Sequence, residues 1–289
     1  MIKLLIRTRR ASLSAALLAV ALLAAPAWAQ EEKPGEKPKA AAESDEELAK
    51  KLSNPIADLV SVPFQFNWQE GYGPNNDLQF YLNVQPVVPF HITKDWNLVG
   101  RFIATYLSQP ELAPGVGPVS GLGTITFSSF LSPADAKGFI WGVGPVFGIP
   151  MTSNPLLGGG QWLMGPTAVG LYMTGGWTIG TLVNQQFSVA DTGNQSLPYF
   201  SQAFIQPFIA YTTHSAVTFT LDTESTYNWE GSPGQRWTVP IIFLVSKLTR
   251  FGPFPFSIQA GGGYYVARPD IGPKWKLRLN FVLLLPAGR

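Results

Sequence analysis

The strongest constraint on the fold is an alternation of apolar and polar residues that runs through most of the chain after residue 61. Near the end of the chain, for example, Trp275, Leu277 and Leu279 alternate with Lys276 and Arg278. Successive side chains of a β-strand point to opposite faces, so each such segment predicts a strand with one apolar and one polar face. Several segments reach the roughly nine residues that a tilted strand needs to cross a bilayer.

The alternation predicts an all-β fold, a transmembrane antiparallel β-barrel of about twelve strands over residues 61–289. Tight connections alternate along the chain with longer ones rich in Gly, Pro, Asn and Ser, which is typical of outer-membrane barrels. The expected strands are 62–70, 78–90, 96–107, 121–131, 138–149, 162–173, 177–188, 200–211, 216–229, 236–248, 254–267 and 274–285.

A soluble β-sandwich or a lipocalin-like barrel also alternates and is the competing fold. Charged residues make up only 13% of this chain, although a soluble domain normally carries about 25%. The polar faces consist mainly of Gln, Asn, Thr and Ser, and aromatic residues gather toward the strand ends as in interfacial girdles. The composition therefore favours the membrane barrel.

The first 29 residues have the features of a secretory signal peptide. Four basic residues precede an apolar stretch, and Ala27-Trp28-Ala29 forms a small-residue cleavage site, so cleavage after Ala29 is expected. Export then places the chain in the outer membrane of a Gram-negative-type envelope. Removal of the leader leaves 16 basic against 18 acidic residues, which gives no basis for nucleic-acid binding.

Between the leader and the barrel we expect two short segments. Residues 30–43 are charged, contain proline and lack aromatic residues, which predicts a disordered periplasmic tail. Residues 44–60 predict a short helical segment, because Ser44 and Glu47 have the spacing of a capping box. Pro55 interrupts or ends this helix. The pattern leaves open whether the helix lies against the barrel or enters its interior.

The residue inventory argues against an enzyme and against a cofactor or metal. The chain has no cysteine and only two histidines. Outer-membrane phospholipases also use twelve strands, but they need a serine and a histidine within hydrogen-bond reach on the barrel wall. His91 and His214 both fall in predicted short turns, so we predict no catalytic, cofactor-binding or metal-binding residues.

The sharpest functional candidates are charged residues on predicted inward faces. Such charges either form a constriction that orders solutes in a pore or form a salt-bridge network that fills a narrow lumen. The sequence leaves both alternatives open. The candidate lumen-lining residues are Arg101, Asp222, Glu224, Arg236, Lys276 and Arg278.

Several short motifs, in their order and spacing, resemble a known family. They are Asn54-Pro55 with Leu59, Val62-Pro63-Phe64-Gln65, Gly142-Val143-Gly144-Pro145, Gly165-Pro166, Gln206-Pro207-Phe208 with Tyr211, Arg236-Trp237-Thr238-Val239-Pro240 and Trp275-Lys276-Leu277-Arg278. From residue 46 to residue 286 the chain is similar to bacterial outer-membrane transporters related to the MetA-pathway of phenol degradation group, whose members are often labelled neuromedin U. The resemblance implies an outer-membrane channel or transporter without an agreed substrate.

We therefore expect a porin-like channel or transporter for small solutes, and the family label adds hydrophobic or aromatic compounds as a substrate class. The alternative is a plugged structural or interaction barrel whose surface loops carry the function, and an outer-membrane hydrolase is a weaker alternative. The expected partners are outer-membrane lipid and lipopolysaccharide, the barrel assembly machinery and an unidentified small-molecule solute.

Overall fold

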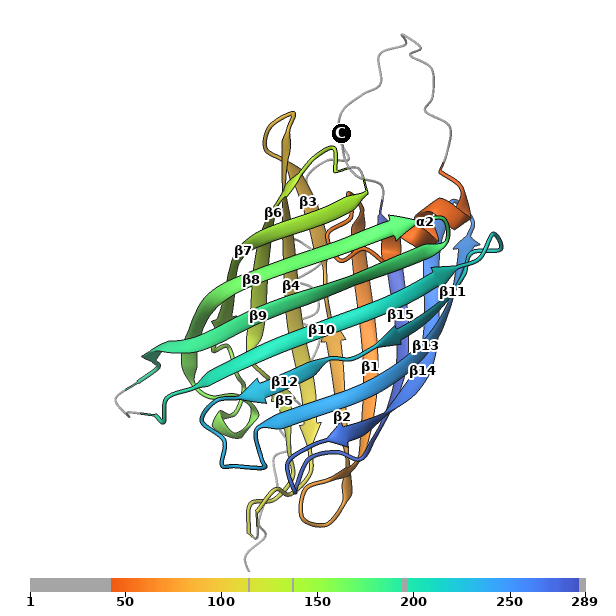
Figure 1. Cartoon of the computed structure of the whole chain (residues 1–289). Coiled ribbons are helices and arrows are strands. Elements are labelled where there is room, and N and C mark those ends of the chain that lie inside the picture. The colour runs from red at the N-terminus through yellow and green to blue at the C-terminus, as the bar shows by residue number, and fades with distance from the viewer. Residues whose placement is uncertain (1–42, 114, 137, 194–196, 286–289) are drawn as a thin grey trace, which may run out of the picture. The chain divides into compact units, whose positions relative to one another are not determined.

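The computed structural model describes residues 43–113, 115–136, 138–193 and 197–285. The predicted signal peptide and nearly all of the predicted tail lie outside the described residues. All described strands belong to one antiparallel sheet, which closes into a barrel of twelve strands and confirms the predicted fold class (Figure 1).

Closure brings the first and last strands together. β1 (Val60–Tyr72) pairs with β15 (Trp275–Leu285) in an unbroken register from Val60 opposite Leu285 to Glu70 opposite Trp275. A closed barrel leaves no sheet edge unpaired, which a bilayer requires. The other unbroken strands are β4 (Trp96–Gln109), β7 (Phe139–Ile149), β8 (Gln161–Thr174), β9 (Trp177–Asp191), β10 (Ser201–Thr212), β13 (Trp237–Phe251) and β14 (Phe254–Ala267).

Three of the predicted strands are each interrupted by two residues, so fifteen strand segments make up twelve strands. One interruption, at Thr223 and Glu224, lies between Pro207 of β10 and Pro240 of β13. Proline has no N–H to donate to a neighbouring strand, so the ladder weakens there. The interrupted pairs are β2 (Asp77–Val84) with β3 (Val87–His91), β5 (Val119–Leu122) with β6 (Ile125–Pro133), and β11 (Val217–Asp222) with β12 (Ser225–Asn228).

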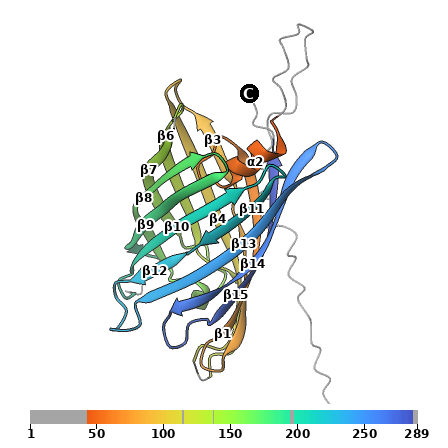
Figure 2. The same ribbon diagram turned by 45° about the vertical axis from the view of Figure 1, so that its right-hand side comes forward.

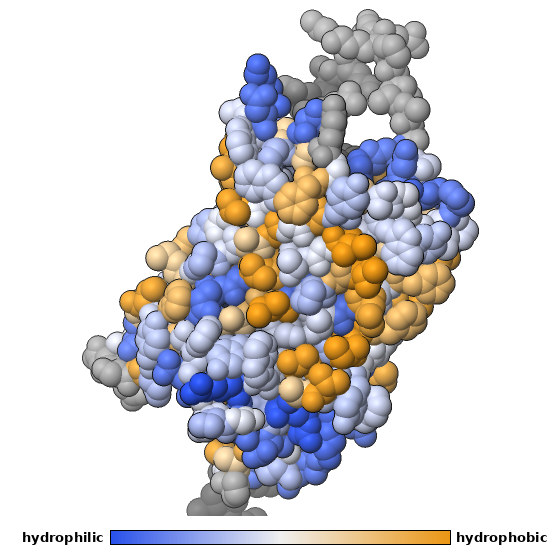
Figure 3. All heavy atoms as spheres, viewed as in Figure 1, coloured by the Kyte–Doolittle hydropathy of each residue, from blue (hydrophilic) through white to orange (hydrophobic). Residues whose placement is uncertain are grey.

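The two faces of the barrel have the opposite polarity to those of a soluble protein. Outward-facing Leu277 is 63% exposed and Trp275 is 55% exposed, whereas inward-facing Asn67, Lys276 and Arg278 are buried. Hydrophobic side chains form orange patches over the outer surface of the strands, among paler groups (Figure 3). An apolar exterior around a polar interior suits a barrel surrounded by lipid and argues against the soluble alternative.

A single α-helix, α2 (Asp45–Leu52), precedes the barrel in the described chain, and the connection after β7 contains a short 3₁₀ turn, η1 (Pro155–Leu157). The predicted capping box is confirmed: the Glu47 amide donates to the Ser44 hydroxyl, and the Ser44 amide donates to the Glu47 carboxylate. The helix ends three residues before Pro55. None of the described helices is long and apolar enough to cross a membrane.

Candidate functional site in the barrel lumen

Residues 45–59, called here the N-terminal segment, enter the end of the barrel where the short turns lie (Figures 1 and 2). Leu48 and Ala49 of α2 are buried against Leu248, Val282 and Leu284 on the inner faces of β13 and β15. Burial of two apolar side chains anchors the helix to the wall. The structure thus answers the question that the sequence left open: the helix lies in the mouth of the barrel, with one face buried against the inner wall.

The residues after the helix pack against the opposite wall of the barrel. Ile56 is 5% exposed and belongs to a second buried cluster. The other members of this cluster come from β4, β6, β8 and β9, so Ile56 anchors the N-terminal segment in an apolar core that four strands share. These members are Val99, Phe130, Val169, Leu171 and Leu182.

Ion pairs at the rim also hold the N-terminal segment. Asp45 accepts a hydrogen bond from Nε of Arg250 at 2.7 Å, and Glu46 is 2.9 Å from Nδ1 of His214 in the β10–β11 turn. Hydrogen bonds from Lys50 and His214 lower the pKa of Glu46 below its usual range. Asp58 similarly lies 3.2 Å from Nε2 of His91. Both histidines of the chain therefore face carboxylates of the N-terminal segment.

Deeper in the lumen, Glu224 sits at the centre of a buried charge cluster. Its carboxylate accepts hydrogen bonds from Nη1 and Nη2 of Arg278 at 2.9 and 2.7 Å, and from Nζ of Lys276 at 2.7 Å. The side chains of Lys276 and Arg278 are each only 2% exposed. A two-pronged contact between an arginine and a carboxylate is strong and fixes the orientation of both groups.

Neutral amides extend this cluster around the wall. Nε of Arg278 donates to Oδ1 of Asn67 at 2.8 Å, and Asn67 donates to the backbone and side-chain oxygens of Gln65. The Gln65 side chain also accepts from Gln85, whose own oxygen accepts from Nη2 of Arg101 at 2.7 Å. One hydrogen-bonded chain therefore connects the cations of β4 and β15.

Asp222 lies apart from these contacts but in the same chamber. Its two carboxylate oxygens are 3.4 and 3.2 Å from Nε2 of Gln206 on the neighbouring strand β10. Asp222 and Glu224 lie two residues apart across the strand interruption and project to the same side. Both negative charges therefore enter the lumen from one wall.

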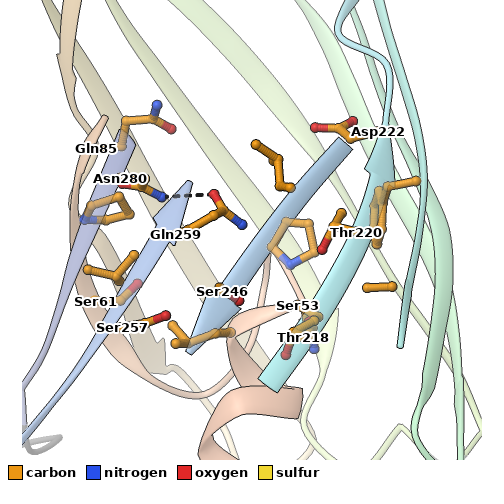
Figure 4. A pocket seen from close by; sticks show the side chains of 18 of the residues that line it. Ser53, Ser61, Gln85, Thr218, Thr220, Asp222, Ser246, Ser257, Gln259 and Asn280 are labelled. Atoms are coloured by element: carbon orange, nitrogen blue, oxygen red, sulfur yellow. Dashed lines mark hydrogen bonds between the residues drawn. The ribbon is translucent and has the colours of Figure 1, made fainter. Parts of the chain in front are cut away.

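Between the charge cluster and the N-terminal segment lies a cavity of about 220 Å³. Its wall carries Arg101, Asp222, Glu224 and Arg278 together with many Ser, Thr, Gln and Asn side chains, and Ser53 and Asn54 belong to its floor (Figure 4). The amide of Asn280 donates to Gln259 in this wall, while its Oδ1 is buried without a partner in the described structure. The chamber is polar and carries charges of both signs, and the N-terminal segment narrows one end of it.

The structure brings five of the six candidate lumen residues to this region. Glu224, Lys276 and Arg278 are in direct contact and Arg101 joins them through amides, whereas Asp222 lies in the same chamber with Gln206 as its partner. Arg236 lies elsewhere, at the long-loop end, where its Nε donates to the Gly231 carbonyl and its Nη1 to the Tyr227 hydroxyl.

Sequence reasoning missed the amides that connect the charges, chiefly Asn67, Gln85 and Gln206. Their signal was present, since each occupies a polar position of an alternating strand. It was weak because most inward positions carry similar residues. The role of Ile56 was missed as well, because the contacts that bury it come from distant strands.

Both histidines lie at the short-turn end of the barrel, and their recorded hydrogen bonds go to Asp58 and Glu46. Among the described residues, no group of three or more His, Cys, Asp or Glu side chains has the arrangement needed to hold a metal ion.

The fold and the lumen place the chain in the class of membrane β-barrels with a polar interior and an internal N-terminal segment. A similar fold occurs in the COG4313 outer membrane channel from Pseudomonas putida F1, with 15% identity over 78% of this chain and 94% of that one, at a TM-score of 0.51. Outer membrane phospholipase A from Escherichia coli is 13% identical over 84% of this chain and 99% of that one, at a TM-score of 0.43. At these identities the likeness concerns the fold alone. No protein-family model and no curated protein matches the sequence.

Proposed function

We propose that this protein is an outer-membrane channel that lets small solutes pass through a narrow polar chamber. The observation that carries the proposal is the combination of an apolar exterior with a solvent-sized chamber lined by charges and amides. The likeness in fold to an outer-membrane channel supports it. In this proposal the leader is cleaved after Ala29 and the barrel assembly machinery inserts the chain.

The charges of the chamber and its cluster give the channel a specific expected behaviour. Glu224 and Asp222 offset two of the three cations Arg278, Lys276 and Arg101, so one net positive charge remains and the native pore selects weakly for small anions over cations. The substrate class that the family resemblance adds, hydrophobic or aromatic compounds, is the finer part of the proposal. The polar wall favours solutes that also carry hydrogen-bonding groups.

Planar lipid bilayers provide the test. The protein extracted from membranes of expressing cells is reconstituted, and its heat-modifiable gel mobility shows that the barrel is folded. We expect discrete conductance steps. In a salt gradient, Glu224→Gln shifts the reversal potential toward anion preference and Arg278→Gln shifts it toward cation preference, while Glu230→Gln in an outer loop changes it little.

The second candidate is a plugged barrel whose surface loops carry the function. The specific observation in its favour is the burial of Leu48 and Ile56 against opposite walls of one barrel end. One outcome contradicts the channel and favours the plugged barrel. In it the protein is heat-modifiable, but neither the native barrel nor its Glu224 and Arg278 variants show conductance steps in the bilayer. We do not propose a hydrolase, because the hydrogen bonds of His91 and His214 lie at the short-turn end and go to Asp58 and Glu46, and neither histidine bonds a serine hydroxyl among the described residues.

A further inference from the structure

A second cavity, of about 700 Å³, lies at the opposite, long-loop end of the barrel. It is formed where the loop between β12 and β13 meets the loop between β14 and β15. Its wall includes Arg236, Arg268 and Asp270 beside the aromatic residues Tyr227, Trp237 and Tyr264. The channel proposal gives this cavity no role.

The two arginines are held in place by neutral oxygens. Nε of Arg236 donates to the Gly231 carbonyl at 2.7 Å and Nη1 donates to the Tyr227 hydroxyl at 3.2 Å. Nη1 of Arg268 donates to the carbonyls of Gly272 at 2.8 Å and Asp270 at 3.2 Å. Carbonyl and hydroxyl partners orient a guanidinium without cancelling its charge. Both groups therefore keep their positive charge, and the hydrogen bonds given above among the described residues use their Nε and Nη1 atoms.

The cavity wall contains one acidic residue, Asp270, beside the two arginines. Asp270 is exposed, and its backbone amide donates to the side chain of Gln235 at 2.8 Å. One carboxylate against two guanidinium groups leaves the cavity with net positive charge. An anionic group with several acceptor oxygens suits two planar guanidinium forks best, and a phosphate has this chemistry.

Next to the arginines the cavity is bordered by outward-facing apolar surface. Trp237 is 43% exposed, Tyr264 is 47% exposed and Val266 is 60% exposed. Tyr227 packs edge-on against Trp237 with ring centroids 4.8 Å apart. Aromatic residues at a strand end are typical of the boundary between head groups and acyl chains. A ligand here meets cations at one end and hydrocarbon-like surface at the other.

We propose that this cavity binds the phosphate-bearing head group of a lipid in the surrounding leaflet, with its acyl chains running along Trp237, Tyr264 and Val266. Arg236 and Arg268 donate hydrogen bonds to the phosphate, and the aromatic residues contact the first methylene groups of the acyl chains. The inference rests on the membrane location proposed above. It does not depend on conduction, because a barrel that conducts no ions offers the same site.

Native mass spectrometry tests this with the protein extracted from membranes into a neutral detergent. Phosphatidic acid is titrated in, with phosphatidylcholine of the same acyl chains and inorganic phosphate as separate probes. We expect discrete binding of phosphatidic acid in preference to phosphatidylcholine. Arg236→Gln and Arg268→Gln each weaken it about tenfold, as expected for loss of a charge-assisted hydrogen bond. Lys94→Gln, which removes a charge from a short turn, leaves it within about twofold.

Unchanged binding in both arginine variants overturns the site. If inorganic phosphate displaces phosphatidic acid at equal concentration, the acyl contacts contribute nothing to binding, and a lipid is not the occupant of the site. Heat-modifiable mobility shows whether each variant is folded. Should the arginine variants fail to fold, Asp270→Asn serves instead: it removes the opposing charge and is expected to tighten phosphatidic acid binding severalfold, and binding that is no tighter overturns the proposal.

Discussion

Replacing Glu224 by glutamine is the most direct test of the buried charge cluster. The change keeps the shape of the side chain and removes the charge that faces Arg278 and Lys276. Three short charge-assisted hydrogen bonds, at 2.9, 2.7 and 2.7 Å, lose their ionic character. Because the side chains of both cations are 2% exposed, solvent compensates them little.

The expected cost follows from this burial. Removing one partner of a buried ion pair costs about 3–5 kcal/mol, because the other partner is left uncompensated. The side chain of Glu224 is itself 21% exposed to the lumen, so the lower end of this range, about 3 kcal/mol, applies. That is a change of about a hundredfold in the unfolding equilibrium.

Urea unfolding of the protein in phospholipid vesicles measures this cost, with tryptophan fluorescence and heat-modifiable mobility as two independent signals. Glu230→Gln is the matched control, because it removes the same charge from an exposed loop position, and its free energy of unfolding should change by less than about 0.5 kcal/mol. The double variant Glu224→Gln with Arg278→Gln should lose less than the sum of the single losses. Equal stability of the Glu224 and Glu230 variants would refute the reasoning, since water would then solvate the cluster.

Four further results are expected. Ile56→Asp places a charge in an apolar cluster, so the N-terminal segment leaves the lumen and single-channel conductance rises. The lowered pKa of Glu46 means that its contacts with Lys50 and His214 stabilise above the usual glutamate pKa and are lost as the pH falls through the lowered value, so the hydrogen-exchange protection factors of α2, corrected for the intrinsic exchange rate at each pH, fall in acid. Gly165→Ala puts a Cβ 1.8 Å from a backbone oxygen of the neighbouring strand and prevents folding of the barrel. Val245→Arg, on the outer face near the middle of β13, costs about 2–4 kcal/mol in urea unfolding.

Each of these results has a control and a contradicting outcome. Unchanged conductance in the Ile56 variant means that the segment does not restrict the pore, and Ile56→Val should resemble the native protein. Glu46→Gln should remove the acid response, and an unaltered response contradicts the assignment. Gly175→Ala offers a comparison in which a Cβ meets nothing within 4 Å, although its positive φ adds strain. A stable Val245→Arg barrel argues against lipid contact.

The strand framework was predictable because one local rule repeats along the chain. The alternation already placed Leu277 on the outer face and Arg278 on the inner face, and it gave the twelve strands. Neighbouring positions of a strand face lipid and lumen in turn, so they require apolar and polar side chains in turn. The strand interruption at Thr223 and Glu224 was not predicted. It depends on prolines in two other strands, whose alignment is fixed only when the sheet is paired.

The candidate site was predictable in its charges and not in its connections. Parity placed Glu224, Lys276 and Arg278 on inward faces, but their contact depends on barrel curvature and strand stagger. Arg236 has a similar local pattern and ends at the loop rim, because it precedes the first residue of β13. The position of the N-terminal segment against the inner wall depends on contacts with strands far along the chain, and no local sequence pattern predicts such contacts.

The packing of Leu48 against Val282 and Leu284 has a consequence for the order in which the molecule is made. The segment is synthesised before every described strand of the barrel, yet part of the surface that buries it is formed by β15, the last described strand. Contacts between such distant parts of a chain form late, because the loop between them must close first. Seating of the segment therefore follows barrel closure, and a newly inserted barrel passes through a stage in which its lumen is wider than in the finished protein.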